Sequence, residues 1–430
     1  MTLTIYMLTA LLIWGGYFLF NSRTRQRHAE IFQRASQSGL TEPVSLHPHI
    51  DSSKCIGCAS CVYACPEETV LGVINGKGQL INPSHCIGHG ACAAACPVEA
   101  ISLVFGSEKR GVDIPVVKPN FETNVPGIFI AGELGGMGLI RNAVEQGRQA
   151  VESIRKTISR GNDDVLDVVV VGAGPAGIAA SLTAMSHHMR FVTLEQDTLG
   201  GAVAHFPRAK VVMTKPVKLP IVGSVKFTET SKENLLAFWE RIVVQTGLKI
   251  RFHERVESIF KDGDILTITT AAKRYRARSV LLCIGRRGTP RKLGVEGEQL
   301  SKVVYRLIDA EQYAGQRVLV VGGGDSALEA AISIANVPNT TVTLSYRSEN
   351  FNRAKEANRR KLEAARSAGN LKVMLGSNVV RIRESSVLIE QGGKTGELPN
   401  DAVIVCAGGI LPSGFLKEIG VEVETKYGTA

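Results

Sequence analysis

The sequence predicts an α/β fold with two doubly wound domains, a small α+β domain and one N-terminal transmembrane helix. Two segments read as a β-branched strand, a glycine-rich turn and an apolar helix, which is the order of elements in a Rossmann-like domain. Two cysteine runs of equal length lie near the N-terminus, and an uncharged apolar stretch precedes them. The 430 residues leave room for about three domains of ordinary size.

The apolar stretch at residues 3–20 is the first element. It is just long enough to span a bilayer with little tilt, so we expect a transmembrane anchor over residues 1–22 and a juxtamembrane linker over residues 23–49. The order of charges is opposite to that of a cleaved signal peptide, because the arginines follow the apolar stretch: Arg23, Arg25 and Arg27. The positive-inside rule then places the N-terminus outside and the catalytic body in the cytoplasm. A helix that lies on a partner is the alternative.

The net charge of +10 raises the question of a nucleic-acid or membrane-surface function. No long basic tract with interleaved aromatic residues occurs, so nucleic-acid binding is not expected. Part of the excess positive charge belongs to the arginines that follow the apolar stretch.

The two cysteine runs have the spacing of iron–sulfur ligands. They are Cys55-x-x-Cys58-x-x-Cys61-x-x-x-Cys65-Pro66 and Cys86-x-x-His89-x-x-Cys92-x-x-x-Cys96-Pro97. Three thiolates spaced by two residues can hold one cluster in a tight loop, while the fourth cysteine of each run ligates the other cluster. One cluster is then expected to take Cys55, Cys58, Cys61 and Cys96, and the other Cys65, Cys86 and Cys92, with His89 in the place of a cysteine.

Residues 50–105 therefore resemble bacterial ferredoxins of the 4Fe-4S type, with two interlocked clusters. His89 is the departure from that pattern. An imidazole can ligate iron and would raise the potential of the cluster. Alternatively, the second site is a three-iron cluster and His89 merely occupies the loop. A disulfide framework or a zinc site is disfavoured, because disulfides suit secreted domains and zinc ribbons lack the third cysteine and the Cys-Pro ending.

The first glycine-rich turn lies in a domain expected over residues 164–295 and is a dinucleotide fingerprint in its proper context. It follows the apolar strand 167–171 and opens a helix, and its glycines are Gly172, Gly174 and Gly177. Such glycines let the backbone approach a pyrophosphate at the helix N-terminus. Glu195 ends the next expected strand, where an acid holds ribose hydroxyls.

A second fingerprint lies in a domain expected over residues 296–410. The apolar strand 317–321 precedes Gly322, Gly324 and Ala327, and the fingerprint permits alanine at the last of these positions. One such unit alone would be a weak indication. Two of them form a pair in which one unit is expected to hold FAD and the other NAD(P)H.

This pair resembles the thioredoxin reductase-like flavoproteins. In the resemblance, Arg347 matches a contact to the 2′-phosphate of NADPH, and Arg353 lies one residue beyond a second basic position. NADPH is therefore favoured and NADH stays open, while a solvated charge at a strand end is the alternative for Arg347. Those reductases carry a Cys-x-x-Cys pair, whereas Cys283 and Cys406 lie far apart here and read as buried strand cysteines.

The closing signature of that family occurs early in this chain. Such flavoproteins finish with Thr-x-x-Pro-Gly-x-Phe-x-Ala-Gly-Asp, and its counterpart here is residues 123–133, ahead of the first glycine turn. We infer a circular permutation in which residues 106–163 fold back beside the FAD domain and residues 411–430 return to it. The resemblance implies three FAD contacts in this segment. Gly132 and Glu133 would contact the ribityl and pyrophosphate region, where Glu133 replaces the usual aspartate. Gln146 would lie near the flavin ring.

Together these features predict an NAD(P)H-dependent oxidoreductase that moves electrons between NAD(P)H, FAD and 4Fe-4S clusters. The expected partner is a membrane-associated donor or acceptor, such as a quinone, a cytochrome or a ferredoxin-like protein, and the chain could form a homodimer. No acid–base constellation for catalysis is recognisable. Two alternatives stay open: a reductase of a low-molecular-weight disulfide through Cys283 or Cys406, and a non-catalytic redox sensor.

Overall fold

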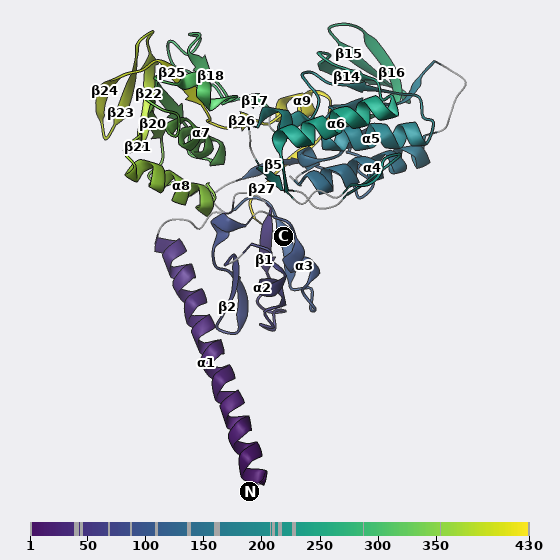
Figure 1. Cartoon of the computed structure of the whole chain (residues 1–430). Helices are drawn as coiled ribbons and strands as arrows, with labels where there is room; N and C mark the ends of the chain where they lie inside the picture. Colours follow the sequence, from purple (N-terminus) through teal and green to yellow (C-terminus); the bar gives the residue numbers. More distant parts are fainter. Residues whose placement is uncertain are drawn as a thin grey trace. The chain divides into compact units, whose positions relative to one another are not determined.

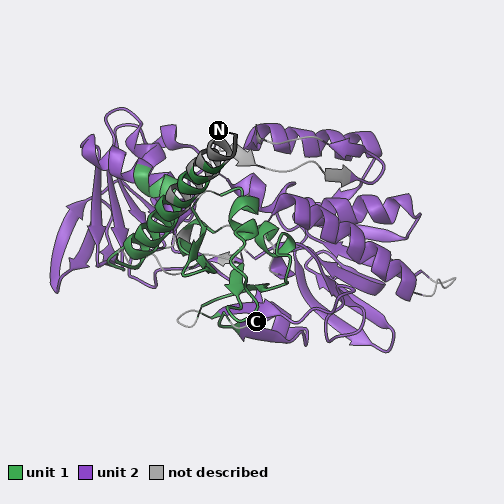
Figure 2. Ribbon diagram, turned by 90° about the horizontal axis from the view of Figure 1, so that it is seen from below, with its two compact units in different colours: residues 1–111, 348–360, 426–430 green, residues 112–347, 361–425 purple. Residues whose placement is uncertain are grey.

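The computed structural model describes the chain except residues 1, 38–42, 44–45, 68, 87, 108–110, 136–138, 159–163, 207, 209–210, 214–216, 226–228, 287, 353 and 429–430. The chain forms two compact units, which Figure 2 shows in different colours. The first unit comprises residues 1–111, 348–360 and 426–430, and the second comprises residues 112–347 and 361–425.

The first unit holds both cysteine runs on a small frame of short strands. Its elements are α1 (Thr2–Gln37), β1 (His47–Ile50), α2 (Ser60–Ala64), β2 (Leu71–Ile74), β3 (Lys77–Leu80), the 3₁₀ turn η1 (Pro83–His85), α3 (Ala91–Ala94) and β4 (Ile101–Val104). β1 pairs antiparallel with β4, and β2 pairs antiparallel with β3. Val70 and Leu71 pack with Cys61 and Cys92, which holds the cysteine-bearing helices α2 and α3 against the strands.

Helix α1 is longer than expected and is attached to β2. It continues without a break to Gln37, so residues 23–37 are helical where a linker was expected. This part is rich in Arg, Gln, Glu and Ala, which are good helix formers. Nδ1 of His28 accepts a hydrogen bond from the N–H of Val73 at 3.1 Å, and a Cβ at Gly72 would lie 2.8 Å from the His28 ring.

The apolar half of α1 was expected to cross a membrane over residues 1–22, and this expectation is not supported. Within the ranges that the structure describes, no helix is both long and apolar enough for a membrane span. Among the described side chains of this half, four large apolar ones are exposed, namely Met7, Leu11, Trp14 and Phe18.

The second unit contains a sheet of seven strands. Six lie in the order β13 (Ile250–Arg251), β8 (Phe191–Leu194), β7 (Leu166–Val171), β16 (Arg274–Leu282), β15 (Ile265–Thr270) and β14 (Val256–Asp262), and β6 (Ile128–Ile130) also pairs with β16. β7 pairs parallel with both β8 and β16, whereas β15 pairs antiparallel with β14 and β16. β7 is buried along almost its whole length, as expected for a central parallel strand.

Residues 106–163 contribute β6 and helix α4 (Ile140–Thr157) to this sheet domain. β6 pairs parallel with β16, with Ile128 opposite Val280. Helix α4 packs along α5 (Pro175–Ser186), and Figure 1 shows the two helices side by side. Their approach is so close that a Cβ at Gly147 would overlap the carbonyl group of Ala176.

The C-terminal segment packs into the same domain. Helix α9 (Ser413–Glu418) places Leu416 in the apolar core that also contains Ile128 and Val280. Strand β27 (Val423–Lys426) pairs with β5 (Val112–Pro115), and the Asn124 side chain donates a hydrogen bond to the Gly420 carbonyl at 2.9 Å. Residues far apart in the sequence therefore complete one domain.

The second unit also contains a parallel sheet that carries the second glycine turn. Its strands lie in the order β18 (Val303–Val304), β25 (Ala402–Val405), β19 (Arg317–Val321), β20 (Thr341–Tyr346) and β21 (Leu371–Leu375). Helix α7 (Asp325–Ala335) follows β19, and α8 (Glu356–Ser367) precedes β21. An antiparallel sheet of β22 (Ser377–Ile382), β23 (Ser386–Gln391) and β24 (Lys394–Pro399) follows.

Several short elements connect these sheets. They are η2 (Glu133–Gly135), η3 (Gly201–His205), β9 (Val211–Met213), β10 (Val217–Leu219), β11 (Gly223–Val225), β12 (Glu229–Ser231), α6 (Lys232–Thr246), β17 (Thr289–Pro290), η4 (Ala310–Tyr313) and β26 (Gly409–Ile410). Helix α6 begins with a capped turn, because the Ser231 hydroxyl accepts the Asn234 N–H at 3.2 Å.

Candidate cofactor sites

The first glycine turn connects β7 directly to α5. Gly172 has φ of +108°, and a Cβ there would lie 2.5 Å from the Cys283 carbonyl oxygen. A Cβ at Gly177 would overlap the carbonyl oxygen of Gly172. Both positions therefore require glycine, and the absence of side chains brings the N-terminus of α5 to the carboxyl end of β7. This is the place where a parallel sheet binds a dinucleotide.

A second pair of glycines faces this turn. A Cβ at Gly174 would lie 3.6 Å from the Cα of Gly201, and one at Gly201 would lie 3.0 Å from the Cα of Gly174. The resulting bare backbone suits a bulky anionic group such as a pyrophosphate. Gly201 was not predicted from the sequence, although the Gly-Gly pair at positions 200–201 indicates a bare backbone.

Glu195 lies beside the same turn. Its carboxylate is buried, with 7% of the residue exposed, and accepts the N–H of Ala173 at 2.7 Å and that of Asp197 at 2.9 Å. These bonds hold the carboxylate between the glycine turn and the end of β8. The predicted ribose-binding acid therefore lies at the turn that it should serve.

Gln146 positions the backbone of the permuted segment. Its Oε1 accepts the N–H of Gly132 at 2.8 Å, and a Cβ at Gly132 would lie 3.0 Å from the Cβ of Ala176 in α5. Gly132 and the first turn of α5 are thus close together. The structure brings the predicted residues 132 and 146 to the end of the sheet that carries the first glycine turn.

Glu133 and Arg286 interact electrostatically, and only Glu133 was predicted from the sequence. Glu133 keeps an exposed surface, yet the surrounding protein desolvates its carboxyl group and raises its pKa, which Arg286 opposes. Burial lowers the pKa of Arg286, and its guanidinium donates to the Asp113 carbonyl at 2.9 Å. Arg286 follows β16 in a loop and has a second arginine, Arg287, next to it in the sequence, so nothing distinguished it from a solvated charge.

The second glycine turn has the same construction at the end of β19. Gly322 has φ of +144°, and a Cβ there would overlap the carbonyl oxygen of Cys406. Gly323 is covered by the Tyr346 ring, which a Cβ would also overlap, whereas a Cβ at Gly324 would meet no heavy atom within 4 Å. Ala327 is buried in the first turn of α7. Gly324 therefore leaves the open side of the turn bare, which fits a pyrophosphate.

Arg347 and Arg353 are the two arginines predicted to contact the 2′-phosphate. Arg347 is exposed directly after β20, at the carboxyl edge of the parallel sheet. Arg353 lies outside the described residues. The position of Arg347 is compatible with a phosphate contact, because ligands of open α/β sheets bind at this edge.

Two thiols of the first cysteine run, those of Cys55 and Cys61, lie next to Gly78 in β3. The Gly78 N–H donates to Cys55 Sγ at 3.3 Å, and a Cβ at Gly78 would lie 3.6 Å from the sulfur atoms of both Cys55 and Cys61. Cys58 is exposed, and its hydrogen bond with the Ser60 hydroxyl lowers the pKa of the thiol. In the second run, Cys96 Sγ accepts the Ala100 N–H at 3.3 Å. Such N–H···S bonds favour thiolate ligands.

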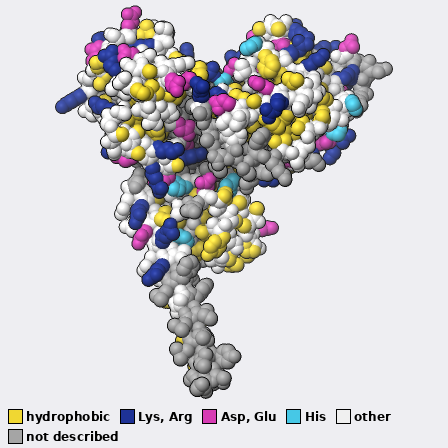
Figure 3. All heavy atoms as spheres, in the orientation of Figure 1, with side chains coloured by type: hydrophobic (Ala, Val, Ile, Leu, Met, Phe, Trp, Pro, Cys, Tyr) yellow, Lys and Arg dark blue, Asp and Glu magenta, His cyan; other side chains and the backbone are white. Residues whose placement is uncertain are grey.

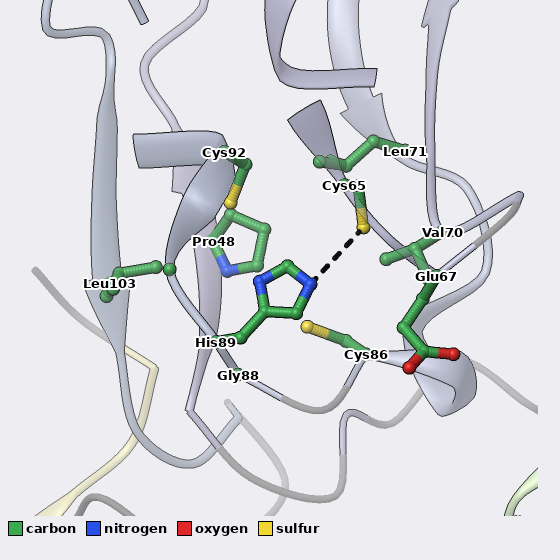
Figure 4. A pocket seen from close by; sticks show the side chains of 11 residues that line it. Pro48, Cys65, Glu67, Val70, Leu71, Cys86, Gly88, His89, Cys92 and Leu103 are labelled. Carbon is green, nitrogen blue, oxygen red and sulfur yellow. Dashed lines mark hydrogen bonds between the residues drawn. The ribbon is translucent and has the colours of Figure 1, made fainter. Parts of the chain in front are cut away.

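Two thiols of the second run, those of Cys86 and Cys92, meet a cysteine from the first run in one pocket. Figure 4 shows Cys65, Cys86, Cys92 and His89 around it, with the imidazole directed toward Cys65. His89 Nε2 lies 3.9 Å from Cys65 Sγ, and Nδ1 receives the Ala91 N–H at 3.3 Å. Val70 and Leu71 form an apolar wall. Cys65 of the first run therefore lies next to two cysteines of the second run, and the place of Cys96 in the first ligand set stays a prediction.

Burial controls the acidity of the enclosed thiols. It raises the pKa of Cys61 and of Cys86 to about 11, and it also raises that of Cys92. Without metal these thiols therefore stay protonated at neutral pH, and metal binding must release their protons. Among the described residues, no three His, Cys, Asp or Glu side chains are placed to hold one metal ion. The thiols instead line one pocket or accept backbone N–H groups, and this set of donors fits iron–sulfur clusters.

The two remaining cysteines lie on different sheets. Cys283 follows β16 and is buried, which raises the pKa of its thiol strongly. Cys406 follows β25 and is half-buried, and its N–H donates to the Val321 carbonyl at 2.7 Å. The structure therefore places each cysteine beside one glycine turn, as a packed residue at the end of a strand.

Comparisons with known proteins agree with both sites. A family model described as pyridine nucleotide-disulphide oxidoreductase matches residues 169–429, and a 4Fe-4S dicluster domain matches residues 47–97. Ferredoxin–NADP reductase of Picrophilus torridus is 30% identical over 270 residues, which cover 60% of this chain and 77% of that protein. Bacilliredoxin reductase Bdr of Bacillus subtilis is 25% identical over 267 residues, covering 60% and 82%.

Among solved structures, the bacillithiol disulfide reductase of Bacillus cereus matches with a TM-score of 0.55 and 23% identity, over 59% of this chain and 81% of that one. Its counterpart from Staphylococcus aureus gives a TM-score of 0.54 at 24% identity. At this identity the match shows the fold alone. With the family match over more than half of the chain, the protein belongs to the pyridine nucleotide-disulphide oxidoreductases, as an NAD(P)H-dependent flavin oxidoreductase that carries an iron–sulfur domain.

Proposed function

We propose that this protein transfers electrons between NADPH and a one-electron protein carrier of the ferredoxin type. The observation that carries the proposal is the combination, in one chain, of two dinucleotide turns with two cysteine runs and a thiol-lined pocket, in a segment that matches a 4Fe-4S dicluster domain. In the forward direction, one NADPH and two oxidised carriers give NADP⁺, one proton and two reduced carriers. The relatives named ferredoxin–NADP reductase support this partner class.

The residues of the chain bind and orient the reactants. Bound FAD and iron–sulfur clusters would supply the conversion of a two-electron hydride into single electrons. The bare turn at Gly172–Gly177 receives the FAD pyrophosphate, Glu195 its ribose, and Gly324 leaves space for the pyrophosphate of NADPH. Arg347 supplies the charge for the 2′-phosphate, which favours NADPH over NADH.

The ligand sets belong to the same proposal. Cys55, Cys58, Cys61 and Cys96 hold one cluster, and Cys65, Cys86, Cys92 and His89 hold the other. The shared pocket of Cys65 with Cys86, Cys92 and His89 supports this partition. Ligation through His89 Nε2 would place the proton on Nδ1, so the contact with the Ala91 N–H would have to be replaced by an acceptor.

Anaerobic titration of the reconstituted protein tests the function. NADPH is expected to bleach the flavin absorption and then to produce EPR signals of reduced clusters, and NADH is expected to do so less effectively. If the flavin bleaches but intact clusters stay oxidised, transfer from the carrier toward NADP⁺ becomes the working direction. If neither nucleotide bleaches bound flavin, the proposal fails in favour of a redox sensor.

A disulfide reductase is the second candidate, because the fold is shared with the bacillithiol disulfide reductases. The burial of Cys283 and the location of Cys406 on another sheet speak against a thiol pair. The double variant Cys283→Ala, Cys406→Ala is therefore expected to keep NADPH-dependent carrier reduction. Loss of this activity with normal flavin content would favour the disulfide reductase.

We further propose that the domain is circularly permuted and that α1 attaches the chain to a membrane, with the catalytic body on the cytoplasmic side. Pairing of β6 with β16 and of β27 with β5 supports the permutation. Exposed Trp14 and Phe18, followed by basic residues at 23–27, support the attachment. Flotation with vesicles tests it: the full chain should float, and a chain without residues 2–22 should stay at the bottom.

A further inference from the structure

The first cysteine run carries an exposed apolar surface around its most exposed thiol. Tyr63 is 80% exposed and Ile56 is 63% exposed, and both flank Cys58 in the sequence. In the described part of residues 46–107, these two are the large apolar side chains with high exposure. Cys58 is itself exposed, whereas the other cysteines of the two runs are half-buried or buried.

Helices α2 and α3 extend this surface. The two helices are in contact, and Pro66, Ala94 and Pro97 beside them are exposed. Figure 3 shows hydrophobic side chains gathered over this part of the chain. We call Ile56, Tyr63, Pro66, Ala94 and Pro97 the apolar face. Its composition, with one aromatic side chain and small residues, resembles the centre of a small transient interface.

The edge of the apolar face at the Cys55–Cys58 loop is basic. The Lys54 side chain is 63% exposed, and Lys77 Nζ donates to the Cys55 carbonyl at 2.7 Å. The nearby carboxylate of Asp51 accepts the N–H and the hydroxyl of Ser53 at 2.9 and 2.6 Å and lies 3.9 Å from Lys54. Positive charge at this edge would attract carboxylates on a partner and accelerate its approach.

The second pocket offers no comparable access. Its thiols share the pocket with Val70, Leu71 and Leu103, and Cys92 is buried, with 4% of the residue exposed. The first run instead places Cys58 at the surface, within the apolar face. A partner that exchanges single electrons can therefore reach the chain most closely at Cys58.

We propose that the apolar face is the docking surface for an acidic one-electron carrier, which accepts or donates one electron per encounter at the Cys58 side of the domain. This inference rests on the proposed function and adds the place and charge of the partner. Tyr63 and Ile56 contact the apolar centre of the carrier, and Lys54 and Lys77 contact its carboxylates.

Binding of a flavodoxin, a small acidic one-electron carrier, tests the surface without turnover. Calorimetric titration of oxidised flavodoxin into the oxidised holoprotein is expected to give at least tenfold weaker binding for the double variant Ile56→Ser, Tyr63→Ser. Lys54→Glu should weaken binding severalfold at low salt and have little effect at high salt. The matched controls Val244→Ser, Phe260→Ser and Lys394→Glu change exposed residues of the second unit and should bind as the wild type does.

The outcomes separate the surface from the function. Unchanged binding in the Ile56/Tyr63 variant, or equal losses in the controls, would overturn the proposal. A wild-type dimer that dissociates in this variant, detected by sedimentation, would also overturn the proposal, because the apolar face would then bind a second copy of the chain. One result would contradict the proposed function and leave the docking surface intact: NADPH bleaches the flavin in none of the samples, while flavodoxin binding follows the expected pattern.

Discussion

His89 is the residue at which the second thiol pocket departs from a four-cysteine site. Its imidazole points into the pocket of Cys65, Cys86 and Cys92, with Nε2 at 3.9 Å from the Cys65 sulfur (Figure 4). A ring in this position can complete the ligand set, and its removal would leave one corner of a cluster without a protein ligand.

The variant His89→Ala is therefore expected to lose iron, from about eight to about seven atoms per chain, and to gain the EPR signal of an oxidised three-iron cluster. His89→Cys should retain the full iron content and lower the potential of the second cluster. Iron analysis and EPR of the holoproteins decide this. A three-iron signal already present in the wild type, and unchanged in His89→Ala, would mean that the imidazole only fills the loop.

Gly174 is the corresponding test residue for the flavin. Its missing side chain opens the space between the turn and Gly201. In Gly174→Glu a carboxylate would occupy this space and repel a pyrophosphate, so the flavin absorption should disappear while the cluster absorption persists. The control Gly396→Glu, on an exposed strand, should retain both. Full flavin content in Gly174→Glu would contradict the assignment of the turn.

At the scale of elements, one ion pair connects the starts of two neighbouring strands. Asp401 precedes β25 and accepts three hydrogen bonds from Arg317 at the start of β19: from its N–H and Nε at 2.8 Å and from its terminal nitrogen at 2.6 Å. The side-chain hydrogen bonds of Arg317 lower the pKa of Asp401 to about 2. The pair is partly exposed, so its contribution to stability is modest.

Because the pKa of the folded state lies below that of the unfolded state, the ionised pair stabilises the fold above about pH 4, and this contribution is lost as the pH falls toward about 2. Asp401→Asn should lower the free energy of unfolding by about 1 kcal/mol at pH 7. In urea unfolding, the difference from the wild type should be constant above pH 5 and shrink below pH 4. The exposed control Asp264→Asn should change little, and a difference independent of pH would assign the effect to another cause.

Elements with a local pattern could be predicted from the sequence, and contacts between distant segments could not. Both glycine turns were visible because a strand, a turn and a helix follow one another within a short stretch. The helix at residues 23–37 was mistaken for a linker because its polar residues lack an apolar face, and its attachment through His28 to Val73 joins segments far apart. Arg286 was missed for the same reason, since its partner Glu133 is distant in sequence.

At the scale of the whole molecule, the order of segments differs from the order in which they pack. Residues 112–158 supply β5, β6 and α4, and the segment with which β5 pairs is β27, near the other end of the chain. The family match over residues 169–429 confirms the flavin oxidoreductase, but it does not include β5, β6 or α4. The sequence could place this segment only through its resemblance to a closing signature.

A rearranged chain tests the permutation. Residues 112–158 would be moved behind residue 425, and a flexible linker would join residue 111 to residue 164. The rearranged protein is expected to bind flavin at the wild-type ratio, because β6 and α4 can reach the same neighbours from the other side. A control with the segment deleted should lose flavin. Equal loss in both chains would mean that the present order is required for folding.

The carbonyl groups of Cys283 and Cys406 each occupy the space that a side chain would need at Gly172 and Gly322. The same backbone arrangement thus occurs twice in the chain. The two cysteines occupy equivalent places in two similar turns, each set by the backbone next to a glycine. What is learned by mutating one turn can then be transferred, position by position, to the other turn within the same chain.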